Sequence, residues 1–176
     1  MHAADIRAAN EADASAVVEY RSTLRAERLP TLFRYDQLPA ADEEAKFLRK
    51  FQDDLDRAFF VAVLDSAVVG HLDLVGGNHA QTRHVAMLGM SVLAPHRGLG
   101  IGSRLLEAGI AWAAQADLRK IQLEVMSNNP RAQALYEKHG FELEGARKKV
   151  VLVDGDYVDL IQMGLALPGE RRITSP

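Results

Sequence analysis

The sequence predicts a protein of the α/β class, more closely the α+β type, whose mixed and mostly antiparallel sheet carries helices on both faces. Three observations support this prediction. Short apolar runs typical of strands alternate with longer amphipathic stretches typical of helices. Several strand-like runs follow one another as hairpins, and two helices come late in the chain. A doubly wound parallel sheet would instead place a helix after almost every strand.

The first elements are predicted from helix signals and charge spacing. A short strand at residues 5–9 precedes a helix at residues 11–29, for which Asn10 is a suitable N-cap and Pro30 a stop. A second helix is expected at residues 41–56, because its charges recur four residues apart as on a solvated face. The predicted pairs are Asp42 with Lys46, Arg49 with Asp53, and Lys50 with Asp54.

The remaining elements are strands and two further helices. Asn129 is a favoured N-cap, Pro130 fits the first position of a helix, and Gly140 suits its left-handed end. The pattern therefore gives about seven strands and about four helices. Strands are expected at residues 58–64, 68–75, 84–93, 120–126, 141–153 and 157–167, and helices at residues 101–116 and 130–140.

Composition favours one soluble globular domain at residues 1–168, followed by a polar tail at residues 169–176. The chain has 176 residues, 48% of them hydrophobic, and its 21 Lys and Arg against 24 Asp and Glu give a formal charge of −3. Nucleic acid needs a basic surface, so no nucleic-acid partner is expected. No apolar run approaches the roughly 20 residues of a membrane span. No secretory pattern opens the chain, so we expect a cytoplasmic location without membrane contact.

The chain contains no cysteine. Disulfides, Cys-ligated zinc, iron–sulfur clusters and a covalent intermediate on a cysteine are therefore excluded. The six histidines show no helical ligand pattern, so no metal site is expected either.

The most informative stretch is a glycine-rich turn, with Gly98, Gly100 and Gly102, between a predicted strand and a predicted helix. Its glycines let the backbone approach a ligand closely, and the following helix N-terminus offers unpaired N–H groups to an anion. A Walker-type loop is excluded, because Ser103 and Arg104 follow the last glycine. A dinucleotide fingerprint fits poorly, because Ser103 stands at its third glycine. A turn that binds nothing stays open at this point.

A second motif follows the turn at a suitable distance. The first motif reads Arg97-x-x-Gly100-x-Gly102, and the second reads Asn129-x-x-Ala132-x-x-Leu135-Tyr136-Glu137-Lys138-x-Gly140-Phe141. Together they closely resemble the GCN5-related N-acetyltransferase (GNAT) family, and in motif its ribosomal-protein N-terminal acetyltransferases most. The resemblance extends more loosely over residues 5–167, so it implies the GNAT fold for nearly the whole chain.

The resemblance implies an acetyl-CoA site on the glycine turn. Backbone N–H groups would hold the pyrophosphate, and the pantetheine arm would pair with the backbone of Val92 and Leu93. Asn129 matches an asparagine that contacts the cofactor, although its N-cap role explains it equally well. The residues implied at the pyrophosphate are Arg97, Gly98, Leu99, Gly100, Ile101, Gly102 and Ser103.

The resemblance also implies residues for acetyl transfer to an amine, which needs an acid, a base and a donor to the thioester oxygen. Tyr136 matches the acid that protonates the thiolate; a buried core tyrosine is the alternative. Glu124 matches a base acting through water, and strand alternation aims it away from the aliphatic layer. A solvated or ion-paired glutamate is the alternative there, and His84 is a second candidate base. The thioester oxygen would meet a backbone N–H of residues 90–92, with a bulge at Gly89.

The implied function is transfer of the acetyl group of acetyl-CoA to a primary amine by direct attack in a ternary complex. The alternative is a non-catalytic acyl-CoA-binding or sensing module of the same fold. The acceptor, a small amine or the N-terminal amine of a peptide or protein, would lie between residues 20–37 and residues 147–157. A homodimer is a further expectation from similar proteins.

Overall fold

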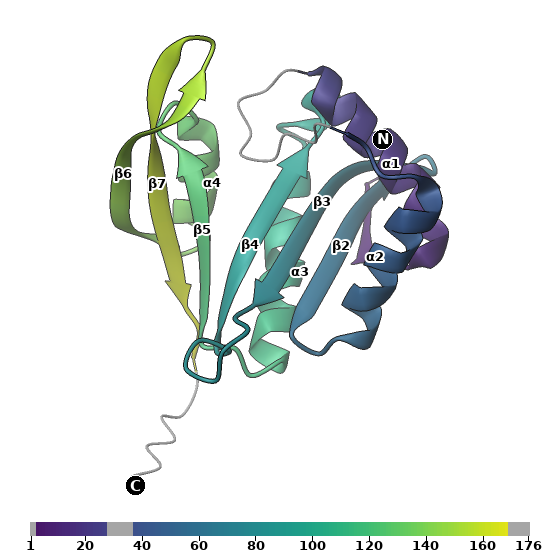
Figure 1. Cartoon of the computed structure of the whole chain (residues 1–176), viewed down its shortest axis with the longest axis horizontal. Coiled ribbons are helices and arrows are strands. Elements are labelled where there is room, and N and C mark those ends of the chain that lie inside the picture. Colours follow the sequence, from purple (N-terminus) through teal and green to yellow (C-terminus); the bar gives the residue numbers. More distant parts are fainter. Residues whose placement is uncertain (1–2, 28–36, 169–176) are drawn as a thin grey trace, which may run out of the picture.

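The computed structural model describes residues 3–27 and 37–168, which build one seven-stranded sheet with helices on both faces (Figure 1). The strands are β1 (Asp5–Ala8), β2 (Arg57–Leu64), β3 (Ala67–Gly76), β4 (Val85–Val92), β5 (Lys120–Met126), β6 (Glu142–Val153) and β7 (Asp156–Ala166). The helices are α1 (Ala14–Ala26), α2 (Ala41–Asp53), α3 (Ile101–Gln115) and α4 (Pro130–Lys138), with the 3₁₀ helices η1 (Glu11–Asp13) and η2 (Ala94–His96). Within these residues, no helix combines the length and the apolar character that a membrane crossing needs.

The sheet is mixed and mostly antiparallel, which confirms the predicted fold class. Its strand order is β1-β2-β3-β4-β5-β7-β6, and of the described strand pairs only β4 and β5 run parallel. On one face, Val17 of α1 and Leu48 of α2 pack with Val61 of β2. On the other face, Leu105 of α3 packs with Leu72 of β3, and α4 joins the same cluster. The sheet therefore separates an α1–α2 face from an α3–α4 face (Figure 1).

The chain enters its first helix through a capping box, as the N-cap prediction for Asn10 requires. The Asn10 side chain accepts from the N–H of Ala12 at 2.9 Å, and Asp13 accepts from the N–H of Asn10 at 2.8 Å. The first turn is the 3₁₀ helix η1, so the α-helix itself begins at Ala14. The predicted stop at Pro30 lies outside the described residues.

The second helix is shorter than predicted. It ends at Asp53, because Asp54 adopts an extended backbone with ψ 121°. Of the three predicted pairs, the ion pairs of the described residues include only the first. The observed pairs are Asp42 with Lys46 at 3.6 Å, Arg49 with Glu11, and Asp54 with Arg57 at 3.1 Å.

A buried ion pair fastens α1 to α2. The side chains of Arg21 and Glu44 contact each other and are 6% and 1% exposed. The Arg21 guanidinium also lies over the rings of Phe47 and Phe59, at 5.4 Å and 5.9 Å from their centroids. Burial raises the pKa of Glu44 above its ordinary value, while the charges of Arg21 and His71 act in the opposite direction. The contact between the two helices thus contains charges that are withdrawn from water.

The sheet opens between its two central strands. β4 and β5 pair over three positions only, residues 85–87 opposite residues 120–122. β4 continues along β3 to Val92, and β5 continues along β7 to Met126. The two strands therefore diverge beyond residue 87, as Figure 1 shows.

No bulge accompanies this divergence in the β3–β4 ladder, so the prediction of a bulge at Gly89 is wrong. Residues 70–76 pair with residues 86–92 in continuous register. A Cβ at position 89 would meet Asp73 Oδ1 at 2.7 Å. The glycine therefore makes room for the Asp73 carboxylate, and the opening arises because β5 leaves β4.

We expect Glu44→Gln to lower the free energy of unfolding by about 3–5 kcal/mol, because the buried Arg21 guanidinium would lose its carboxylate. Urea unfolding at neutral pH measures this change. Lys46→Ala is the matched control, because it removes an exposed pair from the same helix and should cost less than about 0.5 kcal/mol. Equal losses in the two variants would contradict the importance of the buried pair.

Candidate active site

The glycine-rich turn joins the end of β4 to α3 at the open side of the sheet. Gly98 and Gly100 have φ angles of +83° and +78°, in the left-handed region that residues with a Cβ rarely adopt. Gly102 lies in the first turn of α3, where a Cβ would meet Leu135 Cδ2 at 3.0 Å. Two glycines thus shape the turn, and the third lets α4 approach α3.

This geometry leaves a run of unpaired backbone donors. From Gly98 to Ser103, six consecutive N–H groups have no hydrogen-bond partner within the described residues. The next N–H, that of Arg104, donates to the carbonyl of Gly100 at 3.1 Å. The positive end of the dipole of α3 lies at the same place. Converging N–H groups at a helix N-terminus form a binding site for phosphate-like anions.

Arg97 braces the turn but contributes no free backbone donor, which corrects the prediction for this residue. Its N–H donates to the carbonyl of Ala94 at 3.2 Å. Its guanidinium donates to the carbonyl of Val92 at 2.7 Å and to the carboxylate of Glu27 at 2.5 Å. Arg97 therefore ties the end of α1 to the turn, and the free donors begin at Gly98.

The end of β4 also differs from the prediction. The N–H of Leu93 donates to Val69 and its carbonyl accepts from the N–H of His96, each at 2.9 Å, so the Leu93 backbone is already paired. Main-chain groups alternate in direction along a strand, so the N–H groups of Met90 and Val92 point away from β3. These two N–H groups face the side from which β5 has diverged.

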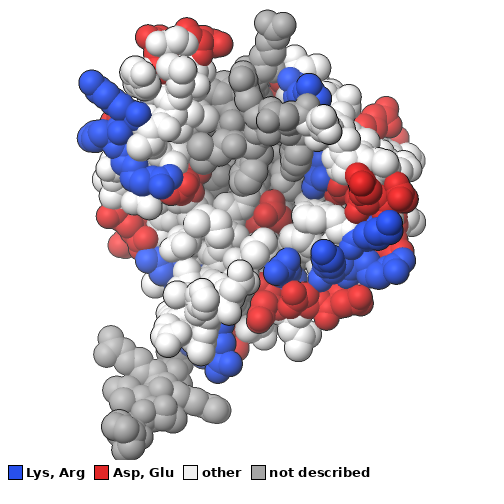
Figure 2. Space-filling model, in the orientation of Figure 1, with Lys and Arg blue, Asp and Glu red and all other residues white. Residues whose placement is uncertain are grey.

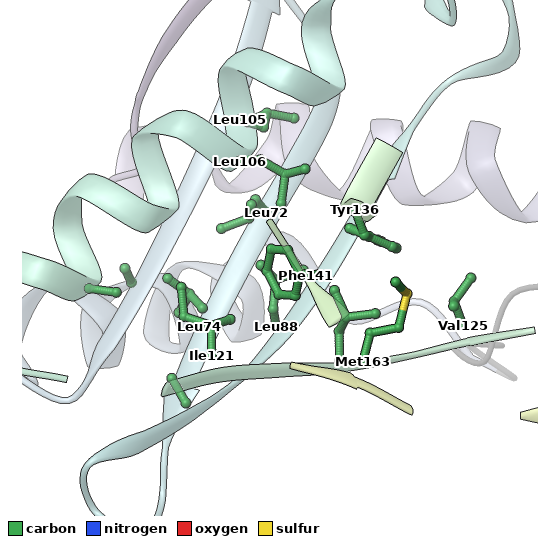
Figure 3. Close-up of a cluster of buried hydrophobic side chains, with 14 of the residues drawn as sticks. Leu72, Leu74, Leu88, Leu105, Leu106, Ile121, Val125, Tyr136, Phe141 and Met163 are labelled. Carbon is green, nitrogen blue, oxygen red and sulfur yellow. The ribbon is translucent and has the colours of Figure 1, made fainter. Parts of the chain in front are cut away.

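Tyr136 belongs to the α3–α4 face. Asn129 caps α4 by accepting from the N–H of Ala132 at 3.2 Å, which confirms its predicted N-cap role. The Tyr136 ring is 6% exposed and packs against Phe141, with centroids 5.7 Å apart (Figure 3). Burial raises the pKa of the Tyr136 phenol to about 12, so the phenol stays protonated at neutral pH. Because Tyr136 follows Leu135, α4 holds it close to the first turn of α3.

Glu124 lies on the opposite face of the sheet. Its neighbours Leu123 and Val125 are buried in the core, whereas the Glu124 side chain is 24% exposed. The carboxylate binds Arg147 of β6 at 3.0 Å and accepts from the amide of Gln162 of β7 at 3.5 Å. Figure 2 shows basic and acidic atoms side by side where the β6–β7 hairpin lies. The ion-paired alternative is therefore the arrangement that the structure shows.

His84 lies far from these residues. It is exposed in the turn before β4, whereas the glycine turn follows the end of the same strand. Eight strand residues at about 3.3 Å each separate the two turns by roughly 26 Å. The structure therefore corrects the assignment of His84 as a second base.

The comparisons with known proteins agree with this geometry. A family model described as "Acetyltransferase (GNAT) family" matches residues 22–141. This chain belongs to the GNAT family. It is 36% identical over 104 residues to the L-amino acid N-acetyltransferase AaaT of Escherichia coli (strain K12), covering 58% of this chain and 64% of AaaT. It is 30% identical over 86 residues to the [Ribosomal protein uS5]-alanine N-acetyltransferase of the same strain, covering 48% of this chain and 44% of that protein.

Solved structures of GNAT proteins match nearly the whole chain. A GNAT-family acetyltransferase from Streptococcus pneumoniae superposes with a TM-score of 0.89 at 28% identity, covering 93% of this chain and 99% of that chain. A phosphinothricin acetyltransferase from Sinorhizobium meliloti, solved in complex with AcCoA, superposes with a TM-score of 0.82 at 25% identity. That match covers 99% of this chain and 94% of the other. Both superpositions confirm the GNAT fold.

The GNAT chain also brings together polar residues that the sequence reasoning missed. Tyr20, His71 and Ser91 form one hydrogen-bonded cluster on the α1–α2 face. The alternation of side chains along a strand could have placed His71 and Asp73 on one face of the sheet. No local sequence signal indicates that Tyr20, 51 residues away, contacts His71. Over the described residues, no group of three or more His, Asp or Glu side chains is placed to hold a metal ion.

We expect Gly100→Ala to lower the free energy of unfolding by about 1–2 kcal/mol, because a Cβ makes the left-handed conformation unfavourable. Nothing lies within 4 Å of the added Cβ, so the cost comes from the backbone alone. Gly145→Ala on β6 is the control, since its Cβ would make an ordinary contact of 3.4 Å with Gln162. Urea unfolding compares the two, and an equal effect would contradict the strain at Gly100.

The raised pKa of Tyr136 makes stability depend on alkaline pH. The folded pKa of about 12 exceeds the ordinary value of 10.0, so the stability of the buried neutral phenol is present below pH 10 and is lost as pH rises toward 12. In that window we expect the wild type to lose about 1.4 kcal/mol per pH unit relative to Tyr136→Phe. Urea unfolding of both proteins from about pH 9 to about pH 12 measures it. Parallel curves would contradict the assignment.

Proposed function

We propose that this GNAT chain is an acetyl-CoA-dependent N-acetyltransferase that acetylates a primary amine by direct attack in a ternary complex. The observation that carries the proposal is the run of six N–H groups, in the turn and the start of α3, that have no partner among the described residues and lie beside the opening between β4 and β5. An anion held at this turn lies next to the place where β4 and β5 diverge, and the acyl chain would lie there. The absence of cysteine favours direct transfer over a cysteinyl intermediate.

The turn fits the pyrophosphate of acetyl-CoA, which would supply the thioester. Space around Gly100 is open, and at Gly98 only the Arg131 side chain comes within 4 Å of an added Cβ, so a phosphate can approach the backbone and meet a cation. We assign the pantetheine arm to the backbone of Val92 and Met90. Asn129 stays a candidate contact at the start of α4. The proposed pyrophosphate donors are the N–H groups of Gly98, Leu99, Gly100, Ile101, Gly102 and Ser103.

We assign Tyr136 as the acid that donates a proton to the departing sulfur. Burial keeps its phenol neutral, and packing on Phe141 restricts the ring. The Tyr136 phenol is close to α3, the helix at whose start the pyrophosphate would bind. It is therefore on the side of the sheet where the CoA sulfur would lie. A phenolate in this buried place is unfavourable, so the equilibrium after transfer to sulfur favours reprotonation of the phenol from solvent.

We assign Glu124 as the group that accepts a proton from the amine through water. It lies on the α1–α2 face, opposite Tyr136, so acid and base approach the opening from different sides. Its ion pair with Arg147 fixes its orientation. The N–H groups of Met90 and Val92 are our candidates for stabilising charge on the thioester oxygen.

The acceptor that we propose is a small amine or the N-terminal amine of a peptide or protein. The relatives named above act, by name, on L-amino acids and on the alanine of a ribosomal protein, and both groups are primary amines. Their names denote enzymes, which favours catalysis over the non-catalytic acyl-CoA-binding module. The acceptor segment at residues 20–37 lies partly outside the described residues.

A homodimer and a cytoplasmic location complete the proposal. The β6–β7 hairpin carries exposed apolar side chains, and such side chains favour association with a second copy. The most exposed of them are Leu143 and Tyr157, each at 68%, and Leu152 at 63%.

We expect Tyr136→Phe to lower kcat by about 100- to 10,000-fold, because the variant cannot donate a proton to sulfur. Release of thiol from acetyl-CoA, measured across a panel of primary amines, reports the rate. Calorimetry should show unchanged binding of CoA, because the free N–H groups of the turn are untouched. Glu124→Gln should also lower kcat, and Arg147→Lys should have a smaller effect because the counter-charge stays.

Each outcome separates one part of the proposal. CoA binding without turnover on any amine would favour the non-catalytic module. Unchanged rates in Tyr136→Phe or Glu124→Gln would remove that residue from the mechanism while leaving the acetyltransferase assignment in place. Loss of CoA binding in Gly100→Ala, with Gly145→Ala unaffected, would support the turn as the pyrophosphate site.

A further inference from the structure

A buried polar cluster lies beside the opening, and the acetyl transfer described above leaves it unused. It joins Tyr20 of α1, His71 of β3 and Ser91 of β4. The Tyr20 hydroxyl lies 2.6 Å from Ser91 Oγ and 3.1 Å from His71 Nδ1, and Ser91 Oγ lies 3.1 Å from the same nitrogen. On the other side of the ring, His71 Nε2 lies 3.3 Å from Asp73 Oδ1.

These neighbours determine which nitrogen of the His71 imidazole carries the hydrogen. An ionised Asp73 only accepts, so Nε2 carries the hydrogen and Nδ1 accepts from a hydroxyl. Phe59 stacks on the ring, with centroids 5.3 Å apart and an interplanar angle of 14°, and fixes its orientation. The charged and hydroxyl groups around His71 come from four elements: Tyr20 and Arg21 of α1, Glu44 of α2, Asp73 of β3 and Ser91 of β4.

Both ends of the cluster reach the surface, although the ring does not. The His71 side chain is 10% exposed, whereas Asp73 is 25% exposed and Ser91 is half-buried. Ser91 stands between Met90 and Val92, whose N–H groups face the opening. Asp73 lies over Gly89, and a side chain at that position would displace its carboxylate. The cluster therefore connects the wall of the opening with solvent.

We propose that Ser91, His71 and Asp73 form a proton relay that deprotonates the acceptor ammonium before it attacks. The relay rests on the proposed acetyltransferase function and deepens it. Ser91 Oγ receives a proton from the ammonium as its own proton passes to His71 Nδ1. The resulting imidazolium keeps its Nε2–H beside the Asp73 carboxylate, and its Nδ1 proton returns through Ser91 Oγ to solvent when the product leaves, which restores the starting tautomer. No covalent bond other than these N–H and O–H bonds changes in the step.

The proton count of the reaction leaves one proton for such a second route. An ammonium has three N–H bonds and the amide product has one, so two protons leave the nitrogen. One is balanced by the proton that the CoA sulfur gains, and the other goes to solvent. Glu124, on β5, accepts the proton released as the C–N bond forms. Ser91, across the opening on β4, is placed to take the earlier one.

Glu124 is the weaker candidate for the first proton because Arg147 already holds its carboxylate. The guanidinium beside this carboxylate repels an incoming ammonium. The His71 cluster has the opposite character, because Asp73 places a negative charge beside the imidazole. We therefore expect the ammonium to lie near Ser91 on β4 before Glu124 on β5 accepts its proton.

Two acceptors of different basicity test the relay. One is the best alkylamine of the panel, which is an ammonium at neutral pH, and the other is an alkoxyamine of the same length, which is already neutral. We expect His71→Gln and Ser91→Ala to lower kcat/KM for the alkylamine by about 10-fold or more and to change the alkoxyamine rate by less than about 2-fold. Glu124→Gln should slow both acceptors, and His84→Gln, which alters a remote exposed histidine, should slow neither.

The double variant Ser91→Ala/His71→Gln should be no slower than either single variant, because both break one relay. Below neutral pH, the dependence of the alkylamine kcat/KM on pH should differ from that of the wild type in His71→Gln. In Glu124→Gln it should match that of the wild type. Equal slowing of both acceptors by Ser91→Ala, or no slowing at all, would overturn the relay. Ser91→Ala carries the test alone if His71→Gln does not fold. A wild type without turnover on either acceptor would instead reject the proposed function.

Discussion

The divergence of β4 from β5 is the constraint on which the rest of the site depends. Three paired positions hold the two strands together, and beyond them each strand keeps its other neighbour. A sheet that opens in its centre leaves strand N–H groups unpaired in the interior, and such groups are costly unless a ligand or water satisfies them. The glycine turn that follows β4 adds six more donors that no other described residue satisfies. The fold therefore places hydrogen-bond donors where the pyrophosphate and the thioester of acetyl-CoA would accept them.

The two faces of the sheet give this opening different chemistry. The α3–α4 face is apolar and supplies the turn and the buried phenol of Tyr136, whose proton is held tightly. The α1–α2 face carries the side chains that we propose accept or pass protons, including Glu124 on β5 and Ser91 on β4. In the proposed mechanism, acyl donor and amine therefore meet in the opening from opposite faces, each beside the kind of group that it needs. This separation matters because an acid and a base in direct contact would neutralise each other.

Local signals predicted much of this arrangement. The glycine turn, the caps at Asn10 and Asn129, the seven strands and the face of Glu124 all follow from residue type and short-range spacing. The errors share one cause, which is that long-range contacts decide what a residue does. Arg97 and Leu93 look like ligand-binding residues, but Ala94, Glu27 and Val69 already use their groups. The glycine at position 89 suggests a β-bulge, but it makes room for the Asp73 carboxylate on the neighbouring strand.

One helix couples the two halves of the site. Tyr20 of α1 and its C-cap residue Glu27 are seven residues apart, about two helical turns, so they lie on the same side of the helix. Tyr20 contacts His71 and Ser91, while Glu27, at the end of α1, binds the guanidinium that braces the glycine turn. The residue next to Tyr20 is Arg21, whose buried pair with Glu44 fixes the position of the helix. A shift of α1 would therefore disturb the anion-binding turn and the polar cluster together. Burial of this ion pair carries a cost in desolvation. That cost is consistent with a requirement to hold the glycine turn and the polar cluster in fixed relative positions.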